Sequence, residues 1–254
     1  MTAPTAPVTG AGHGPDVWRD RVTAAAHRSL ADLRALVPGR DTVVVVSAHP
    51  DDESIGAGRL LAAWVRTGGR ARAVLATDGE ACVDHVGARP AGIAARRRAE
   101  WRRALDLLGV EAGDTLALPD GGLAGAAADL DRSVVAALAP DVRGTTVLLA
   151  PHPLDPHPDH RAVGRSAARV AERLGVPVWS FPVWLTYWSD PSTDLGATLV
   201  TVDVDAADER AWQSAVACFE SQLLPLADGW GAIVPPAMLA HHDRQLLLVH
   251  RSTT

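Results

Sequence analysis

An α/β fold with a mostly parallel sheet and helices on both faces is predicted by two features of the sequence. Short hydrophobic runs rich in β-branched residues alternate with amphipathic stretches of helical period, which is typical of successive β-α-β units. In addition, residues 43–46 are four consecutive valines. A continuous apolar strand of this kind is typical of a parallel sheet buried on both faces. Together, the two features indicate a Rossmann-like arrangement.

Length, composition and charge narrow the class of protein. The chain has 254 residues, of which 47% are hydrophobic and 21% charged, and this predicts one globular domain over residues 15–254. Residues 1–14 are rich in Pro, Thr, Ala and Gly, which predicts a disordered tail and no secretory signal. The net charge of −6 argues against nucleic acid as a partner. No apolar run reaches the roughly 18 residues of a membrane span. Two distant cysteines fit a cytoplasmic location.

The first half of the chain is predicted to alternate between helices and strands. Apolar residues at helical spacing indicate the helices, and glycine or Pro-Gly follows each of them. The strands are short apolar or alternating runs that end in polar turns. In chain order, we expect a helix at 15–37, a strand at 42–47, a helix at 55–67, a strand at 72–77, a helix at 92–108 and a strand at 114–118.

The second half continues this alternation and then changes character. Four aromatic residues crowd a Pro-containing segment near residue 184, and the elements after it are farther apart. Hydrophobic periodicity and turn residues again indicate the individual elements. We expect a helix at 129–139, a strand at 145–150, a helix at 160–174, strands at 177–182 and 199–204, a helix at 206–222 and a final strand at 245–250.

A polar cluster that includes His49, Asp51 and Asp52 directly follows the valine strand. In open α/β sheets, chemistry collects just beyond the carboxyl ends of the strands. His49 and Asp52 are three residues apart at a strand-to-helix junction, so both side chains can converge on one point. They could supply two of the three protein ligands that a catalytic zinc needs, and the remaining position is left for water. A third ligand must come from another strand end.

A second polar loop, residues 151–160, follows the strand expected at 145–150. The ends of parallel strands share one edge, so His160 could complete a His-Asp-His set with His49 and Asp52. Taken singly, an Asp at a helix start is as often a cap as a ligand. Two His/Asp clusters, each directly behind a hydrophobic strand, nevertheless favour a metal site.

Two motifs in this order resemble the LmbE/PIG-L family of zinc-dependent N-acetylglucosamine-type deacetylases. They are Ala-His-Pro-Asp-Asp-Glu at residues 48–53 and His-Pro-Asp-His at residues 157–160. Further segments resemble other parts of the family pattern and extend the resemblance over most of the chain. These are Thr-Asp-Gly-Glu at 77–80, the Arg-x-x-Glu pattern at 97–100, Leu-Gly-Val at 108–110, Leu-Pro-Asp-Gly at 118–121 and Ser-Gln at 221–222.

The resemblance implies a role for each residue of the two motifs. His49, Asp52 and His160 would bind Zn²⁺, with Fe²⁺ as an alternative metal, and water would take the open position. Asp51 would be the general base that accepts a proton from this water. His157 would donate a hydrogen bond to the oxyanion or a proton to the leaving amine.

The implied partner is a small N-acetylated sugar or a sugar-containing molecule. By resemblance, Arg97 and Asp120 would hold sugar hydroxyls. Trp184 and Trp188 are expected either to line the acceptor side of the pocket or to be buried at the edge of the sheet. The identity of the sugar stays open, and a thiol conjugate or an antibiotic glycoside is an alternative substrate. The oligomeric state is also open, with a homo-oligomer as one alternative.

The sequence departs from part of the family at one position. Some members have a Tyr two residues before the position of His157, where it helps to polarise the carbonyl. This chain has Asp155 there, and an ionised carboxylate cannot donate a hydrogen bond. Either His157 with the metal suffices, or His152 or a loop residue takes that part.

Two other classes of function compete with a deacetylase. Two His and one carboxylate also form the facial triad of non-haem iron oxygenases, but that class usually has an all-β barrel. A sugar- or nucleotide-binding module is the other class. The Gly-Ala-Gly at residues 56–58 lacks the third glycine of a dinucleotide fingerprint, and a binding module has little use for the full set of His and Asp residues.

Overall fold

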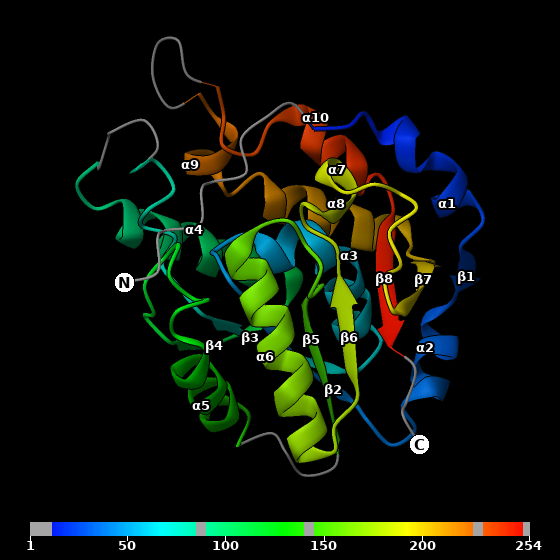
Figure 1. The fold of residues 1–254 in the computed structure, drawn as a ribbon. Helices are drawn as coiled ribbons and strands as arrows, with labels where there is room; N and C mark the ends of the chain where they lie inside the picture. The colour runs from blue at the N-terminus through cyan, green and yellow to red at the C-terminus, as the bar shows by residue number, and fades with distance from the viewer. Residues whose placement is uncertain (1–11, 85–89, 140–144, 226–230, 251–254) are drawn as a thin grey trace.

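The computed structural model describes residues 12–84, 90–139, 145–225 and 231–250. These residues form one eight-stranded sheet with the order β1-β7-β8-β6-β5-β2-β3-β4. Neighbouring strands pair in parallel, except that β8 runs antiparallel to both β6 and β7. Helices pack on both faces of the sheet (Figure 1). The predicted α/β fold with a mostly parallel sheet is therefore confirmed.

Strands and helices alternate along most of the described chain. The strands are β1 Ala26–Arg28, β2 Thr42–Ser47, β3 Arg70–Leu75, β4 Glu111–Thr115, β5 Thr146–Pro151, β6 Val178–Phe181, β7 Ala197–Val202 and β8 Gln245–His250. The α-helices are α1 Arg19–Thr23, α2 Leu30–Leu36, α3 Asp52–Arg66, α4 Ile93–Leu108, α5 Ala127–Leu138, α6 Pro158–Leu174, α7 Leu185–Trp188, α8 Ala206–Val216, α9 Glu220–Leu223 and α10 Pro236–Leu239. Short 3₁₀ helices also lie at Pro15–Trp18 and Ala240–His242.

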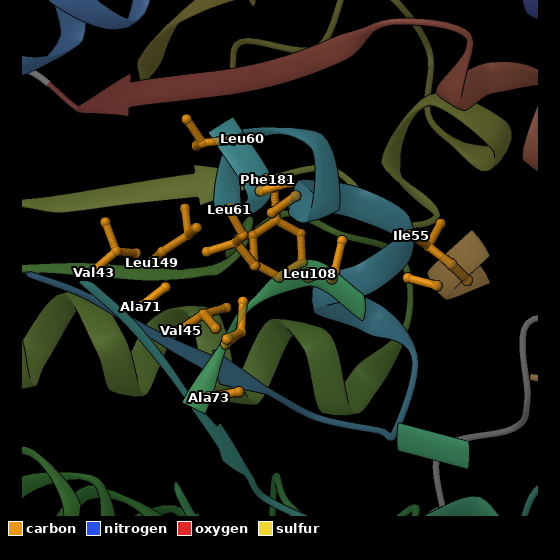
Figure 2. Close-up of a cluster of buried hydrophobic side chains, with 14 of the residues drawn as sticks. Val43, Val45, Ile55, Leu60, Leu61, Ala71, Ala73, Leu108, Leu149 and Phe181 are labelled. Carbon is orange, nitrogen blue, oxygen red and sulfur yellow. The ribbon is translucent and has the colours of Figure 1, made fainter. Parts of the chain in front are cut away.

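Strand β2 lies inside the sheet, and each of its residues is buried. Successive side chains of a strand point to opposite faces, so Val43 and Val45 belong to one apolar cluster and Val44 and Val46 to another. The first cluster includes residues of α3, α4 and α8, and the second includes residues of α5 and α6. Figure 2 shows Val43 and Val45 beneath apolar side chains of α3 and α4. Full burial stabilises by roughly 1.5–3 kcal/mol per side chain of this size.

The register of the central strands brings the two polar loops to one edge. Strand β5 pairs in parallel with β2, with Val43 opposite Val147 and Val45 opposite Leu149. Both strands therefore end at the same edge of the sheet. Helix α3 begins at Asp52, soon after the end of β2, and α6 begins at Pro158, a few residues beyond β5. The predicted convergence of these two loops is confirmed.

The prediction of one helix over residues 15–37 is wrong. This segment forms a 3₁₀ turn, α1, β1 and α2 in succession. Ser29 caps the start of α2 with a capping box. Its side chain accepts a hydrogen bond from the Asp32 N–H, and the Asp32 carboxylate accepts one from the Ser29 N–H. Strand β1 pairs with β7, with Ala26 opposite Val200. A partner so far along the chain overrides the helical periodicity of this segment.

Other elements also differ from the prediction, most of them by one to three residues at an end. Strand β4 lies at Glu111–Thr115, earlier than the expected 114–118, because Glu111 and Ala112 already pair with Arg72 and Ala73 of β3. The helix expected at 206–222 ends at Val216, and the chain turns at the buried Phe219 before α9. The short helices α7 and α10 were not predicted at all.

Residues 1–11 of the predicted tail lie outside the described residues. Residues 12–14 of the predicted tail are described, and they contact the domain: the His13 N–H donates to the Tyr187 carbonyl at 2.7 Å. The extent of the domain, residues 15–254, stays a prediction. None of the described helices combines the length and the apolar character that a membrane span needs.

Candidate metal centre

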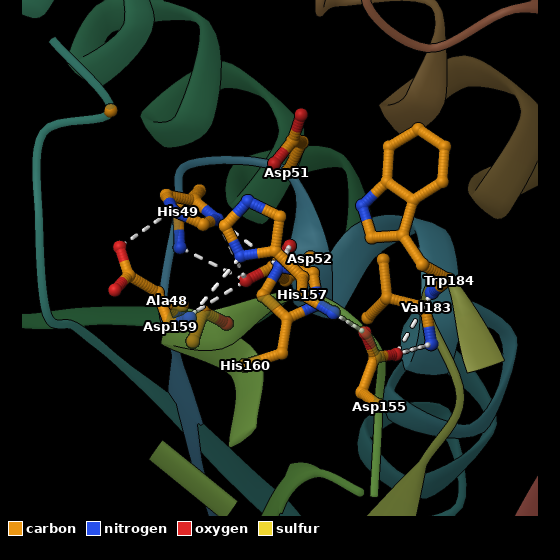
Figure 3. A network of polar contacts seen from close by, with 12 residues as sticks. Ala48, His49, Asp51, Asp52, Asp155, His157, Asp159, His160, Val183 and Trp184 are labelled. Carbon is orange, nitrogen blue, oxygen red and sulfur yellow. Dashed lines mark hydrogen bonds and ion pairs between the residues drawn. The ribbon is translucent and has the colours of Figure 1, made fainter. Parts of the chain in front are cut away.

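Five polar side chains meet where β2 and β5 end. His49 and Asp51 lie in the turn between β2 and α3, and Asp52 is the first residue of α3. His157 precedes α6 and His160 lies in its first turn. His157 is half-buried and the other four side chains are buried. Figure 3 shows them grouped around one point.

The three predicted metal ligands present one atom each to a common space. The His49 Nδ1 and His160 Nε2 atoms are 3.1 Å apart, and the Asp52 Oδ1 atom lies 3.1 Å from the same His160 nitrogen. The nearest Asp52 oxygen to His49 Nδ1 is Oδ2, at 3.7 Å. A tetrahedral zinc with bonds of about 2.0–2.2 Å would hold its ligand atoms roughly 3.3–3.6 Å apart. The types of donor atom suit a zinc ion, and the two separations at His160 Nε2 are close to those of neighbouring ligand atoms.

The orientation of Asp52 is fixed by the backbone that precedes it. Its Oδ2 accepts the N–H groups of Ala48 and His49, each at 2.9 Å, which leaves Oδ1 to face His160. Burial alone would raise the pKa of Asp52, but His160 and His49 hold it well below its usual range. Asp52 is therefore an ionised carboxylate, the form that binds a metal.

The nitrogen of His49 that faces away from this space meets two carboxylates. Its Nε2 lies 3.1 Å from Asp120 Oδ1 and 3.4 Å from Asp159 Oδ2. Asp159 is fully buried and also accepts the N–H groups of Gly121 and Leu123. A hydrogen on Nε2 that points at a carboxylate leaves the Nδ1 lone pair free for a metal. Asp120 thus contacts His49, whereas the sequence had suggested a sugar contact for it.

The far nitrogen of His160 also meets a carboxylate. His160 Nδ1 lies 3.2 Å from Asp155 Oδ1, so Nε2 is the atom left for the metal. Burial alone would lower the pKa of His160, but Asp52 and Asp155 raise it to about 9. The surroundings therefore favour positive charge at this point. The sequence carries no signal for this contact, because it shows only that an Asp stands where some relatives have a Tyr.

Two sets of three metal-capable side chains among the described residues have ligand atoms that all lie within 4.8 Å of one another, and neither set includes Asp52. One is His49, His157 and His160, and the other is His49, Asp120 and Asp159. The second is the weaker candidate, because both Asp159 oxygens already accept backbone N–H groups. The first shares two of its members with the predicted ligands, so the question is whether His157 or Asp52 is the third ligand.

His157 is held as a neutral hydrogen-bond donor. Its Nδ1 accepts the Asp159 N–H at 3.3 Å, so the ring hydrogen lies on Nε2. Burial lowers the pKa of His157 to about 3, and the neighbouring His160 and His49 act in the same direction. Its ring centroid lies 4.5 Å from that of His160 and 4.8 Å from that of His49. This arrangement suits a donor beside the metal more than a ligand.

Asp51 is paired with an arginine from a different element. The Arg97 Nη2 atom on α4 lies 3.3 Å from Asp51 Oδ2, and Arg97 Nη1 donates to the Gly79 carbonyl at 2.9 Å. Burial raises the pKa of Asp51, while Arg97 opposes this rise without cancelling it. The Arg97 Nε atom is buried and has no hydrogen-bond partner in the described part of the chain.

Glu53 follows Asp52 in α3, and the described hydrogen bonds of its side chain go to serine hydroxyls and not to the predicted ligand atoms. It is fully buried and accepts hydrogen bonds from the hydroxyls of Ser47, at 2.7 Å, and Ser54, at 2.8 Å. Burial raises the pKa of Glu53 to about 7, since the two hydroxyls offset only part of the cost of the buried charge.

Two motifs that are distant in sequence meet at Glu100. This buried carboxylate accepts from the Ser221 N–H at 3.0 Å and from the Ser221 hydroxyl at 2.5 Å. Gln222 donates in turn to the Ser221 hydroxyl at 3.0 Å. These contacts tie α9 to α4, the helix that carries Arg97.

The aromatic segment lies on the β6 side of the centre. Trp184 immediately precedes α7, and its ring stacks on that of Trp188 with the centroids 4.3 Å apart. Both side chains pack against the main apolar cluster. In Figure 3 the Trp184 indole stands on the same side of the centre as Asp155 and Val183. A place in the wall of a substrate pocket remains a prediction for both tryptophans.

Comparisons with known proteins agree with the motifs and the fold. The family described as "PIG-L: GlcNAc-PI de-N-acetylase" matches residues 44–171. No curated protein gives a significant match.

Among solved structures, a zinc-inhibited form of teicoplanin deacetylase is 16% identical, with a TM-score of 0.63, over 84% of this chain and 100% of that one. A conserved protein from Thermus thermophilus is 26% identical, with a TM-score of 0.53, over 71% and 80%. An N,N′-diacetylchitobiose deacetylase from Pyrococcus horikoshii is 21% identical, with a TM-score of 0.53, over 70% and 71%. The first and third likenesses, at this low identity, bear on the fold alone.

Proposed function

The chain belongs to the PIG-L family of deacetylases, and from this premise we propose that it is a zinc-dependent N-deacetylase acting on an amino sugar or a sugar-containing small molecule. One observation carries the proposal. His160 Nε2 lies 3.1 Å from both His49 Nδ1 and Asp52 Oδ1, which is close to the spacing of neighbouring ligand atoms on one zinc ion, and Asp51 is next to Asp52 in the chain.

In this proposal His49, Asp52 and His160 hold the metal. A zinc ion held by these residues would supply a Lewis acid that polarises the amide carbonyl and would lower the pKa of a water molecule from 15.7 to about 7. Asp51 accepts the proton of that water as it attacks the carbonyl carbon. The surroundings support this role, because burial makes Asp51 a stronger base than an exposed Asp and Arg97 fixes its orientation.

His157 stabilises the oxyanion in the proposed reaction. Its Nε2–H is free to donate, since Nδ1 already accepts a backbone N–H. A neutral donor placed where negative charge develops lowers the barrier. Because His157 is held neutral, Asp51 returns the proton that it took and delivers it to the leaving amine as the C–N bond breaks.

The acyl group is proposed to be acetyl and the substrate a small N-acetylated sugar conjugate. The family description names a GlcNAc conjugate. Teicoplanin deacetylase and N,N′-diacetylchitobiose deacetylase, by their names, act on teicoplanin and on N,N′-diacetylchitobiose. The stacked Trp184 and Trp188 rings would form an aromatic wall for such a molecule.

The decisive experiment presents zinc-loaded protein with a panel of N-acetylated sugars, nucleotide sugars, thiol conjugates and glycopeptides. We expect equal amounts of acetate and free amine from at least one of them. Zinc-loaded protein with Asp51→Ala is the control and should release neither product at a comparable rate. Oxygen consumption with the Fe²⁺-loaded protein, in place of acetate release, would instead support an oxygenase.

A further inference from the structure

Asp155 accepts hydrogen bonds from five groups in two segments of the chain, residues 157–160 and 183–185. Its Oδ1 lies 3.0 Å from the His157 backbone nitrogen and 3.2 Å from His160 Nδ1. Its Oδ2 accepts three consecutive backbone N–H groups just before and at the start of α7. These are the N–H groups of Val183 at 3.2 Å, Trp184 at 2.9 Å and Leu185 at 3.1 Å.

These contacts require a carboxylate at this position. Asp155 has no exposed surface, so water cannot replace a missing partner, and a buried N–H without an acceptor costs about 1–3 kcal/mol. All four backbone groups are donors, and none can turn into an acceptor. An amide in place of the carboxylate would direct its NH₂ group at one of the two sets of donors. No neutral side chain of this size has two oxygens that only accept.

We propose that Asp155 is a positioning residue that couples the metal ligand His160 to the aromatic segment at Trp184. Through Oδ1, it holds the hydrogen of His160 on Nδ1 and directs Nε2 toward Asp52 and His49. Through Oδ2, it fixes the backbone of Val183 to Leu185, and with it the base of the Trp184 side chain. A single buried group therefore sets both the metal site and the place of this tryptophan.

The state of the His160 side chain affects the Val183–Leu185 backbone through Asp155. When the metal holds His160 in place, Asp155 is also held, and its second oxygen stays on the three N–H groups. When the His160 imidazole is free to rotate, Asp155 loses a partner and the Val183–Leu185 backbone loses part of its restraint. Coupled sites influence one another by the same factor, commonly about 5- to 150-fold.

The proposal gives a different task to a position that carries a tyrosine in some relatives. A tyrosine two residues before His157 could donate to the substrate carbonyl, whereas Asp155 is buried and all its contacts are internal. His157 then has to supply the hydrogen bond to the carbonyl oxygen without this help. This task of His157 rests on the proposed deacetylase reaction, but the coupling itself does not.

The first test uses the unaltered protein and measures amide hydrogen exchange of the Val183–Leu185 segment with and without zinc. We expect zinc to slow exchange of these three amides by about 5-fold or more, although none of them belongs to a metal ligand. The amides of β8, in the same sheet, serve as the internal reference. Equal exchange of the Val183–Leu185 amides in the two samples would overturn the proposal.

The second test replaces Asp155 by Asn and measures zinc affinity by competition with a chelating dye. Loss of a carboxylate that orients a histidine ligand typically lowers metal affinity about 10- to 100-fold, and we expect this range. The zinc-dependent protection of Val183–Leu185 should disappear as well. At saturating zinc, KM for an accepted substrate should rise, because Trp184 is no longer held in place.

The matched control is Asp208→Asn. Asp208 is another buried carboxylate, but it holds Arg66 and the Asp205 N–H at the start of α8. This change should lower stability and leave zinc affinity and the exchange difference unaltered. Wild-type zinc affinity in Asp155→Asn would contradict the proposal. If that variant does not fold, the exchange experiment on the unaltered protein decides alone.

The two tests separate this inference from the proposed function. Zinc affinity and amide exchange need no substrate. A protein that shows the coupling but hydrolyses no N-acetylated sugar would disprove the function and retain the inference. An active deacetylase in which zinc does not change the exchange of the Val183–Leu185 amides would support the function and disprove the inference.

Discussion

The guanidinium group of Arg97 lies 3.3 Å from the carboxylate of Asp51, and both side chains are buried. Arg97 lies on α4 and Asp51 in the turn before α3, and the resemblance implies a contact with substrate hydroxyls for Arg97. In the structure its Nη1 is also engaged, by the Gly79 carbonyl. Breaking one side of a buried ion pair is costly, because the remaining charge is left without its partner.

We expect Arg97→Met to act on Asp51 and hence on turnover. The loss of the positive charge should lower kcat about 10- to 100-fold, because the general base Asp51 is no longer held in position. KM should stay within about 3-fold of its original value. The acid limb of the pH–rate profile should shift to higher pH, because Arg97 opposes the raised pKa of Asp51. Arg103→Met, at an exposed position of the same helix, is the control. A rise in KM with unchanged kcat would instead favour a direct role in holding the sugar.

Asp51→Ala should lower kcat about 10²–10⁴-fold, which is the usual contribution of a general base. Zinc content should stay equimolar with protein, since Asp51 is not among the three converging ligand atoms. Steady-state acetate release and elemental analysis of the same sample check both expectations. Full activity of this variant on any hydrolysed substrate would rule out the mechanism.

His160→Ala and His157→Ala should separate ligand from donor. We expect His160→Ala to lose zinc and activity together, because it removes one of the three converging atoms. His157→Ala should retain zinc and lose about 10²–10³-fold in kcat, as expected for an oxyanion donor. Elemental analysis after dialysis distinguishes the two cases. Loss of zinc from His157→Ala would move the third ligand from Asp52 to His157.

Glu53 should make the stability of the metal-free protein depend on pH. Its pKa is about 7 in the folded state and about 4.3 in an unfolded chain. The folded state thus binds the proton more tightly, and its stability is lost as pH rises from about 4.3 to 7.

Glu53→Gln removes this loss. We compare the unfolding free energy of this variant with that of the unaltered protein at two pH values. The difference in favour of the variant should be roughly 2–3 kcal/mol larger at pH 8 than at pH 5. Urea unfolding in the presence of a chelator measures it, and Glu172→Gln, at an exposed position of α6, is the control. An equal difference at both pH values would mean that the buried carboxyl is not protonated.

Trp188→Ala should raise KM about 10-fold if the stacked Trp184–Trp188 pair lines the pocket, because an aromatic contact is worth ~0.5–1.5 kcal/mol beyond the area that it buries. The half-buried Trp212, which lies over Arg59, provides the control variant Trp212→Ala, for which no change in KM is expected. Unchanged substrate affinity in Trp188→Ala would assign this pair to the core.

The central strands, and the meeting of the predicted ligand residues at one place, could be predicted because their signals are local. Four valines in a row indicate a buried strand wherever they occur, and polar residues directly after such a strand reach the carboxyl edge of the sheet. The position of His160 beside Asp52 then follows from the parallel pairing of β2 with β5. The pairing of these two strands is the one long-range relationship on which this prediction depends.

The features that the sequence did not predict depend on contacts between distant segments. Strand β1 is three exposed residues, and it exists because β7 offers it a free edge. The role of Asp155 depends on the N–H groups of Val183 to Leu185, and that of Arg97 on a helix packed beside Asp51. A motif identifies which residue type is present, but it does not identify the partner brought there by packing.

The antiparallel direction of β8 has a practical consequence for handling the protein. Strands β2, β5 and β6 all point toward the edge that carries the metal centre, whereas β8 points away from it. The chain therefore leaves the sheet after His250 at the opposite edge (Figure 1). A fusion partner or a surface linker attached beyond His250 should leave the catalytic side facing the solution. An immobilised reactor built in this way would expose the same face of every molecule to the substrate stream.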